Sequence, residues 1–480
     1  TKSGPTRDDL ENWGVGLTGE FELTDSITLK SISAYREVSN QTVDDSDGSA
    51  ASAASLSENF RQDQFSQEVQ LIGSTPKLQW VVGLYYFQEH GVELTDVRLL
   101  PGIFGALSRL PGAVLPLTPT STCPGAPPMN ICAGGLGNPR NFALDIGYQD
   151  SNNIRLKNYA AFGQGTLRLN DKLSLTVGGR LTYEQKKLNR FQRRQQASEF
   201  LGTDQFFLAP IELEDSWTNF APRVSIDYSP SPPFLLYASY TGGFRSGTFN
   251  GRSNSVAAAT TPVDPETVQS FETGLKSELF DRRLRANLAG FYNRYKDIQI
   301  LANQATAGGG FTVFLTNAAR AEIYGAELEV TARPTTPVEL TAALGYLHTK
   351  ILQVDPTVQA ATGLRAGARL RKAPEFTATV SGRYTVPLAS GDLSALVDYT
   401  YRSDQFHAAN NDPLTREGGY GLLNARVAFQ SRDKAWEVAA FGRNLTSKVF
   451  YGALFVAGGS IGVAYPQRGI EYGLSVRRAF

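Results

Sequence analysis

Residues 173–184 read LSLTVGGRLTYE, a segment in which apolar and polar side chains alternate. In an extended chain, one face of this segment carries apolar residues and a glycine: Leu173, Leu175, Val177, Gly179, Leu181 and Tyr183. The other face carries Ser174, Thr176, Gly178, Arg180, Thr182 and Glu184. Successive side chains of a β-strand point to opposite faces, so this period of two predicts a strand with one apolar and one polar face.

The same alternation recurs along the whole chain. Residues 13–23 and 376–386 repeat it with equal regularity, whereas no segment sustains the helical period of 3.6 residues. Counting such segments gives 17 candidate strands. The sequence therefore predicts an all-β fold.

The connections between these strands are of two kinds. Eight are short turns, at residues 24–26, 74–77, 170–172, 230–233, 281–283, 335–337, 389–392 and 431–434. The others are long and polar or glycine-rich, at residues 41–62, 94–153, 195–215, 247–266, 302–312, 351–373, 407–419 and 446–469. Short turns at one end and long loops at the other are typical of a transmembrane antiparallel β-barrel of the outer membrane, with the short turns in the periplasm. A soluble β-sandwich does not segregate its loops by length in this way.

Composition and residue placement exclude other classes of function. Lys+Arg and Asp+Glu both total 46, so there is no net charge and no basic footprint for nucleic acid. No run approaches the ~18 apolar residues of a membrane-spanning helix, but a barrel strand needs only alternate apolar residues. His90, His348 and His407 are dispersed, which argues against Ser–His–Asp catalysis and against a metal site. We expect neither an enzyme nor a bound cofactor.

The alternation also predicts which side chains face lipid. Leu284, Ala286, Leu288 and Tyr292 are expected to face lipid, and Arg285, Asn287 and Asn293 the lumen. Aromatic residues gather near the ends of predicted strands, at Tyr85, Tyr86, Phe87, Tyr292, Tyr295, Tyr399 and Tyr401. Aromatic rings favour the lipid–water interface, so these positions support a membrane barrel.

The end of the chain resembles a known assembly signal. Ile470, Tyr472, Leu474 and Val476 alternate toward the terminal Phe480. This segment resembles the C-terminal strand that the outer-membrane assembly machinery recognises, which ends in an aromatic residue. Arg478 falls on the apolar face and departs from that pattern, although an arginine near a strand end can reach the interface.

Four segments resemble the barrel of TonB-dependent outer-membrane receptors. They are residues 240–250 (YTGGFRSGTFN), 265–276 (PETVQSFETGLK), 317–329 (NAARAEIYGAELE) and 441–445 (FGRNL). Each is degenerate alone, but their order and spacing through the second half of the chain make the combination specific. Residues 13–200 match this family only in architecture.

The resemblance implies a multi-pass barrel in the outer membrane of a Gram-negative bacterium, surrounded by outer-membrane lipid. It also implies TonB-energised uptake of a scarce nutrient, most simply a ferric siderophore or a similar chelate, although family members also take up cobalamin or carbohydrates. A passive porin-like channel is the alternative.

The family's barrel has about 22 strands and holds a plug domain. We therefore expect residues 1–480 to form a partial barrel without the plug domain and without about the first five strands. The TonB complex would act through that N-terminal part, and the first and last strands of this chain would not pair with each other.

The resemblance places ligand capture in the extracellular loops and the upper lumen. Candidate contacts are Arg245, Asn250, Arg252, Arg320 and Tyr451, because arginine binds anionic ferric chelates through charge-assisted hydrogen bonds. The alternative is that residues 245–250 are only a structural transition from strand to loop.

The two cysteines, Cys123 and Cys132, lie in a loop rich in proline and glycine. In an oxidising compartment such as the periplasm or the cell surface they are expected to form a disulfide that pins an extracellular loop. Two unpaired thiols are the alternative.

Overall fold

The structure is a computed structural model of the chain, and it describes residues 6–45, 54–99, 145, 147–253, 255–305, 311–457 and 461–479. Seventeen strands in these residues form a single sheet, as the alternation predicted. β1 to β9 are Arg7–Thr24, Ile27–Asp45, Ala54–Ser74, Leu78–Leu99, Tyr148–Arg168, Leu173–Arg194, Phe206–Tyr228, Phe234–Arg245 and Glu266–Leu279. The others are β10 (Leu284–Ala305), β11 (Phe311–Thr335), β12 (Val338–Val354), β13 (Phe376–Leu388), β14 (Gly391–Arg402), β17 (Tyr420–Ser431), β18 (Trp436–Arg443) and β21 (Glu471–Arg478).

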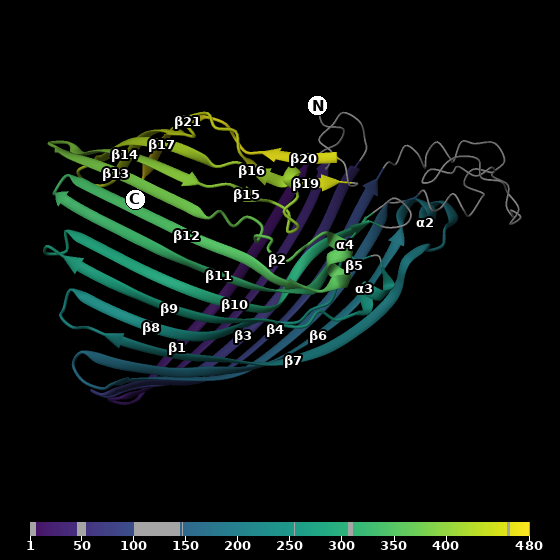
Figure 1. Cartoon of the computed structure of the whole chain (residues 1–480), viewed down its shortest axis with the longest axis horizontal. Helices are drawn as coiled ribbons and strands as arrows, with labels where there is room; N and C mark the ends of the chain where they lie inside the picture. The colour runs from purple at the N-terminus through teal and green to yellow at the C-terminus, as the bar shows by residue number, and fades with distance from the viewer. Residues whose placement is uncertain are drawn as a thin grey trace, which may run out of the picture.

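Each strand of this sheet pairs antiparallel with the next one along the chain, so the sheet is a meander that curves into a wall (Figure 1). The eight predicted short turns all join neighbouring strands at one end of the wall, on the left of Figure 1. Among the described strands, β1 pairs only with β2, and β21 pairs only with β18. The first and last strands therefore do not close the wall on each other.

The strands extend further at the long-loop end than the hydrophobic pattern indicated. β3 begins at Ala54, inside a predicted loop, and β4 continues to Leu99. Both strands keep their hydrogen-bond register there, from Ala54 opposite Leu99 onward. A strand that leaves the bilayer has water on both faces, so it keeps its ladder of hydrogen bonds and loses the alternation that predicted it.

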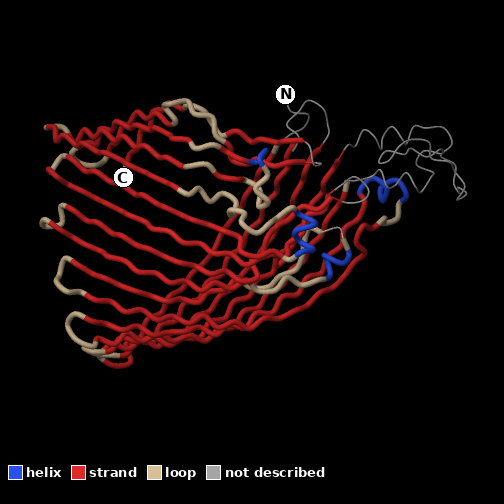
Figure 2. The backbone as a smooth tube through the Cα atoms, viewed as in Figure 1, coloured by secondary structure: helices blue, strands red, loops and turns tan. Residues whose placement is uncertain are grey.

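The smaller elements all lie at the long-loop end (Figure 2). They are α2 (Gln195–Leu201), α3 (Val256–Thr260), α4 (Pro356–Thr362), the 3-10 helix η3 (Pro413–Thr415), the pair β15 (Gln405–Phe406) and β16 (Arg416–Glu417), and the pair β19 (Tyr451–Ala457) and β20 (Ile461–Pro466). None of the helices in the described part of the chain is long and apolar enough to cross a membrane.

The concave face of the wall is identified by a segment that crosses it. Residues 246–264, between β8 and β9, hydrogen bond to Arg190 of β6 and to Leu315 of β11. These two strands lie five places apart in the sheet, and one segment can reach both only across the concave side. The side chains of Arg190 and of the residues in step with it therefore point into the lumen.

The two faces differ in chemistry as expected. One cross-strand row on the outer face is formed by Leu236, Leu275, Leu288, Leu328 and Leu344. One residue away, the row on the inner face includes Lys276, Asn287 and Glu329. Leu284, Ala286 and Tyr292 share the parity of Leu288, and Arg285 and Asn293 share that of Asn287, so the structure has the predicted faces.

An aromatic row runs along the outer face, one ring per strand from β1 to β13. It consists of Trp13, Tyr35, Phe65, Tyr86, Tyr159, Tyr183, Phe220, Tyr240, Phe271, Tyr292, Tyr324, Tyr346 and Phe376. Many of these rings are direct cross-strand neighbours, as in Tyr86–Tyr159, Tyr159–Tyr183 and Phe271–Tyr292. A belt of this kind marks a membrane–water interface, and the wall continues beyond it toward the long loops.

The last strand places the residues of the expected assembly signal on the outer face. Tyr472, Leu474 and Val476 are 72%, 81% and 66% exposed and stand opposite Gly442, Ala440 and Val438. Arg478, the departure from the pattern, places its guanidinium 5.1 Å from the ring centroid of Trp436. Phe480, Cys123 and Cys132 lie outside the described residues.

Candidate functional site at the long-loop end of the lumen

The segment after β8 folds back onto the inner face of the wall. Phe249 packs against Trp217 of β7, with ring centroids 6.1 Å apart, and against Leu188 of β6. Lys186 Nζ donates a hydrogen bond to the backbone oxygen of Gly247 at 2.6 Å. A layer of chain therefore covers the lumen-facing surface of β5 to β7.

Asn250 holds this segment in place. Its Nδ2 donates to the backbone oxygens of Ala258 (3.1 Å) and Leu315 (2.9 Å), and its Oδ1 accepts from the backbone N–H of Leu315. The Asn250 residue is only 6% exposed. With its amide occupied by backbone partners, Asn250 acts in this structure as a clamp between the β8–β9 segment and β11.

A buried ion pair lies beneath the clamp. Arg190 Nη2 is 3.2 Å from Asp150 Oδ1, and these side chains are 0% and 5% exposed. Arg190 Nη1 donates to the backbone oxygen of Asn250, and Gln192 Nε2 donates to Asp150 Oδ2 at 3.4 Å. The pair thus connects β5 and β6 to the segment that crosses the lumen.

A second carboxylate, Asp145, fixes α2 at the same end. One carboxylate oxygen accepts from the backbone N–H of Ala197 at 2.7 Å, and the other accepts from Gln196 Nε2 at 3.3 Å. Arg194 Nη1 donates to the Asp145 backbone oxygen at 2.6 Å. Burial raises the pKa of the Asp145 carboxyl above its ordinary value, although these N–H donors and Arg194 oppose the rise.

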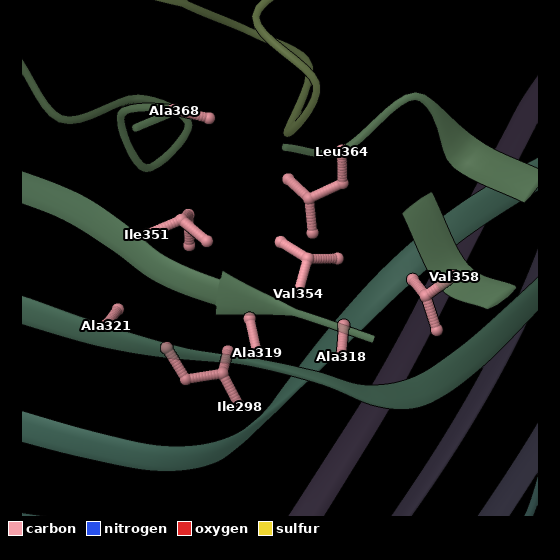
Figure 3. Close-up of a cluster of buried hydrophobic side chains, with 9 residues drawn as sticks. All are labelled: Ile298, Ala318, Ala319, Ala321, Ile351, Val354, Val358, Leu364 and Ala368. Carbon is pink, nitrogen blue, oxygen red and sulfur yellow. The ribbon is translucent and has the colours of Figure 1, made fainter. Parts of the chain in front are cut away.

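The connection between β12 and β13 folds inward as well (Figure 3). Val358 of α4 and Leu364, two residues beyond the helix, pack on alanine and isoleucine side chains of β10 to β12, including Ala319, Ala321 and Ile351. Asp355 caps α4 by accepting from the backbone N–H of Thr357 at 2.8 Å. This apolar cluster anchors a loop over the inner face of the wall.

The last two long connections are joined through Glu417. Its Oε2 accepts from Gln405 Nε2 at 2.9 Å and lies 3.1 Å from His407 Nε2. Its Oε1 accepts from the backbone N–H of Tyr451 at 2.7 Å. Lys372 Nζ donates to the backbone oxygen of Gly452 at 2.9 Å, so the β12–β13 connection reaches the same hairpin.

The five predicted ligand contacts do not converge on one point. Arg245 ends β8 exposed and has the parity of the inner face. Arg252 is 71% exposed, with Nη2 3.9 Å from Glu93 Oε1. Tyr451 is half-buried in the β19–β20 hairpin. Arg320 stands between the buried Ala319 and Ala321, so alternation turns it to the outer face of the wall, away from the lumen.

Sequence reasoning missed a cluster of cations in the β12–β13 connection. Arg365, Arg371 and Lys372 are exposed there, beside Arg369, which pairs with Asp404 at 3.2 Å. The signal was available, because four cations fall within residues 365–372. These cations follow α4, which packs against the inner face of the wall. They bring exposed positive charge to the connections that fold over the lumen.

Comparison with known proteins identifies the family. Residues 1–445 match the family described as TonB dependent receptor-like, beta-barrel. The chain belongs to this family. The chain is therefore a β-barrel protein of a Gram-negative outer membrane, as the sequence predicted, and the family is one of receptors and transporters.

Relatives in sequence cover only part of the chain. The chain is 25% identical over 311 residues to the ferric-pyoverdine M114 receptor PbuA of Pseudomonas sp. strain M114, covering 64% of this chain and 34% of the relative. It is 25% identical over 181 residues to the metal-pseudopaline receptor CntO of Pseudomonas aeruginosa, covering 37% of this chain and 23% of the relative. The chain thus spans about a third of the length of the first of these relatives.

Solved structures share the fold over nearly the whole chain. The ferric yersiniabactin uptake receptor FyuA from Yersinia pestis superimposes with a TM-score of 0.73 at 16% identity, covering 99% of this chain and 62% of that one. The siderophore receptor PiuA from Acinetobacter baumannii gives a TM-score of 0.68 at 16% identity, covering 98% and 64%. At these identities the likeness establishes the barrel architecture.

Proposed function

We propose that this chain forms the barrel wall of a receptor for TonB-energised uptake of a ferric siderophore or a similar anionic metal chelate. The observation that carries the proposal is the layer of inward-folded connections at the long-loop end, which presents exposed arginines above the lumen. The names of the relatives support the ligand class, since pyoverdine, yersiniabactin and other metal-chelate receptors recur among them.

The chemistry of the layer suits an anionic ligand. Arg245, Arg252, Arg365 and Arg371 are exposed, whereas the buried Arg190 is already paired with Asp150. Guanidinium groups bind carboxylate, hydroxamate or catecholate oxygens through charge-assisted hydrogen bonds. We propose that these four arginines capture the chelate, with Tyr451 at the margin, and that Asn250 shapes the layer without contacting the ligand. The role is transport, with no catalytic step.

Among the described strands, β1 and β21 each leave one edge unpaired, which supports a larger wall. Unpaired backbone N–H and C=O groups cost several kcal/mol each in hydrocarbon, so the edges require partner strands. We propose that further strands of the same receptor cover them, that residues 1–480 are one part of its barrel, and that the TonB complex supplies the energy through a plug. The outer face of β21 is proposed as the surface that the assembly machinery recognises.

The proposal is tested with the intact receptor and a panel of ferric chelates of the hydroxamate, catecholate and carboxylate classes. Calorimetry should find one class that binds, and exchanging Arg371 for Gln should weaken that binding about tenfold through loss of one charge-assisted contact. The matched control is Arg320→Gln on the outer face, which should bind like the unchanged receptor. Uptake of radioactive iron in that chelate should require a functional TonB complex.

A passive porin-like channel makes the opposite predictions. It would conduct ions steadily in planar bilayers, bind none of the chelates, and admit solutes equally with and without TonB. That combination of results would overturn the receptor proposal.

A further inference from the structure

A groove opens on the outer face of β3 to β6, directly below the aromatic row. Its volume is about 430 Å³. Leu84 and Leu181 stand on either side of Ala161, and the rings of Tyr86, Tyr159 and Tyr183 lie across its upper end. The groove faces away from the lumen, toward the membrane.

A small residue on β5 forms the floor of this groove. Ala161 follows Tyr159 on the outer face, and its methyl group leaves a space between Leu84 and Leu181. Val69 of β3, opposite Leu84, lines the same space. This apolar furrow can hold an alkyl chain.

Two exposed cations stand above the groove on the same strand. Lys157 and Arg155 lie two and four residues beyond Tyr159, about 7 and 13 Å farther along β5 on the outer face. Both are exposed, and within the described part of the chain neither forms a salt bridge. Lys187 beside Arg155 differs, since its Nζ is 2.5 Å from Glu212 and 3.9 Å from Glu214.

We propose that this surface binds a phosphate-bearing lipid of the outer leaflet, with one acyl chain in the furrow and the phosphate at Lys157 and Arg155. The positions of the furrow, the tyrosine row and the two cations relative to the membrane surface fit such a lipid. The tyrosine row marks the interface, the furrow lies on its hydrocarbon side, and the cations lie at headgroup height, where each contributes to binding of anionic lipid. A soluble protein partner could not reach a groove on the lipid side of the belt.

The site is independent of ligand capture, because the lumen layer lies on the other face of the wall. Arg190 and Leu188 point inward from β6, whereas Leu181 and Tyr183 point outward. A bound lipid would hold β4, β5 and β6 at a fixed depth beneath the buried Asp150–Arg190 pair. Loss of the lipid site therefore leaves the uptake proposal untouched, and failure of the uptake proposal leaves the lipid site untouched.

The test uses the intact receptor in dodecyl maltoside, titrated with lipid A and followed by native mass spectrometry. The double variant Arg155→Gln/Lys157→Gln should bind lipid A about 30-fold more weakly, as two lost cation contacts at a membrane surface imply. Ala161→Phe fills the furrow from an exposed position and should weaken binding at least about tenfold, the effect of displacing two methylene groups.

The matched control is Arg294→Gln/Lys350→Gln. These cations stand at the same height on β10 and β12, but they flank Glu322 in the register, and each variant's folding is checked by its heat-modifiable migration on gels. The control should bind lipid A like the unchanged receptor. The proposal is overturned if the control loses as much binding as the double variant, if Ala161→Phe binds normally, or if inorganic phosphate alone displaces the lipid.

Discussion

The two ends of the wall are held by different kinds of contact. At the short-turn end the hydrogen bonds stay within a turn or join neighbouring strands: Thr75 Oγ1 accepts from the Leu78 N–H at 3.0 Å, and Arg168 Nη1 donates to the Pro76 oxygen at 3.4 Å. At the long-loop end they also join parts of the chain that are not neighbours in the sheet, as in Asn250 to Leu315 and Lys372 to Gly452.

The difference shows where binding specificity can develop. A turn whose side chains bond within the turn does not depend on distant residues, and neighbours in the turn set the pKa of its acidic residues. The side chain of Ser431 and the N–H of Ala435 lower the pKa of Asp433 in this way. The long-loop end instead depends on particular pairs of residues, so single substitutions there should have the larger effects.

The largest effect is expected at the buried ion pair. Exchanging Arg190 for Met leaves the carboxylate of Asp150 without its partner at 5% side-chain exposure and removes the bond to the Asn250 carbonyl. Breaking a buried pair on one side costs about 3–5 kcal/mol. Hydrogen exchange should show residues 246–264 opening with a correspondingly lower free energy.

The matched control is Arg193→Met, on the same strand. Its partner Asp204 and Arg193 itself have side chains 46% and 34% exposed, so the change should cost only about 0.2–1 kcal/mol. Equal effects of the two substitutions would show that burial does not determine how much each ion pair contributes to stability.

The second-largest loss of stability is expected from a charge placed on the outer face midway between the two ends of the wall. Leu288 is 49% exposed on the outer face, four residues from the start of β10 and four from Tyr292, which places it near the bilayer midplane. Leu288→Arg should destabilise the barrel by about 2–4 kcal/mol in urea unfolding from phospholipid vesicles. Asn287→Arg, on the adjacent inner position, should change stability by no more than about 0.5 kcal/mol. The reverse result would mean that Asn287 faces lipid and Leu288 faces the lumen, opposite to the structure.

These contrasts also explain what could be predicted from the sequence. The strands, their faces and all eight short turns follow from local patterns, because alternation and turn chemistry act over a few residues. The clamp at Asn250 could not be predicted from a local pattern, because its partner Leu315 lies 65 residues away and is brought to it by the curvature of the wall. The direction of Arg320 could not be predicted for a similar reason, because it depends on the pairing of β11 with the neighbouring strand β12.

An intermediate effect is expected at the clamp. Asn250→Ala removes two donors and one acceptor and leaves buried backbone groups of β11 unsatisfied, which should lower the opening free energy of residues 246–264 by about 1–3 kcal/mol. Asn250→Asp keeps the acceptor for the Leu315 N–H, so its opening free energy should fall between those of Asn250→Ala and the unchanged receptor. Chelate affinity that drops while hydrogen exchange stays unchanged would instead make Asn250 a ligand contact.

The smallest effect is expected at the short-turn end, at the pair between Arg333 and Glu339. Arg333 Nε and Nη2 both donate to Glu339 Oε2, at 2.9 and 2.6 Å, a geometry closer than that of the Arg190–Asp150 pair. These side chains are 64% and 32% exposed, however, so water screens their attraction and the pair should contribute no more than about 1 kcal/mol. A double-mutant cycle with Arg333→Ala and Glu339→Ala measures this coupling, and it should fade as salt is raised to about 1 M. A coupling as large as that of the buried pair would mean that distance, and not burial, sets the strength of ion pairs in this wall, and the contrast between its two ends would be lost.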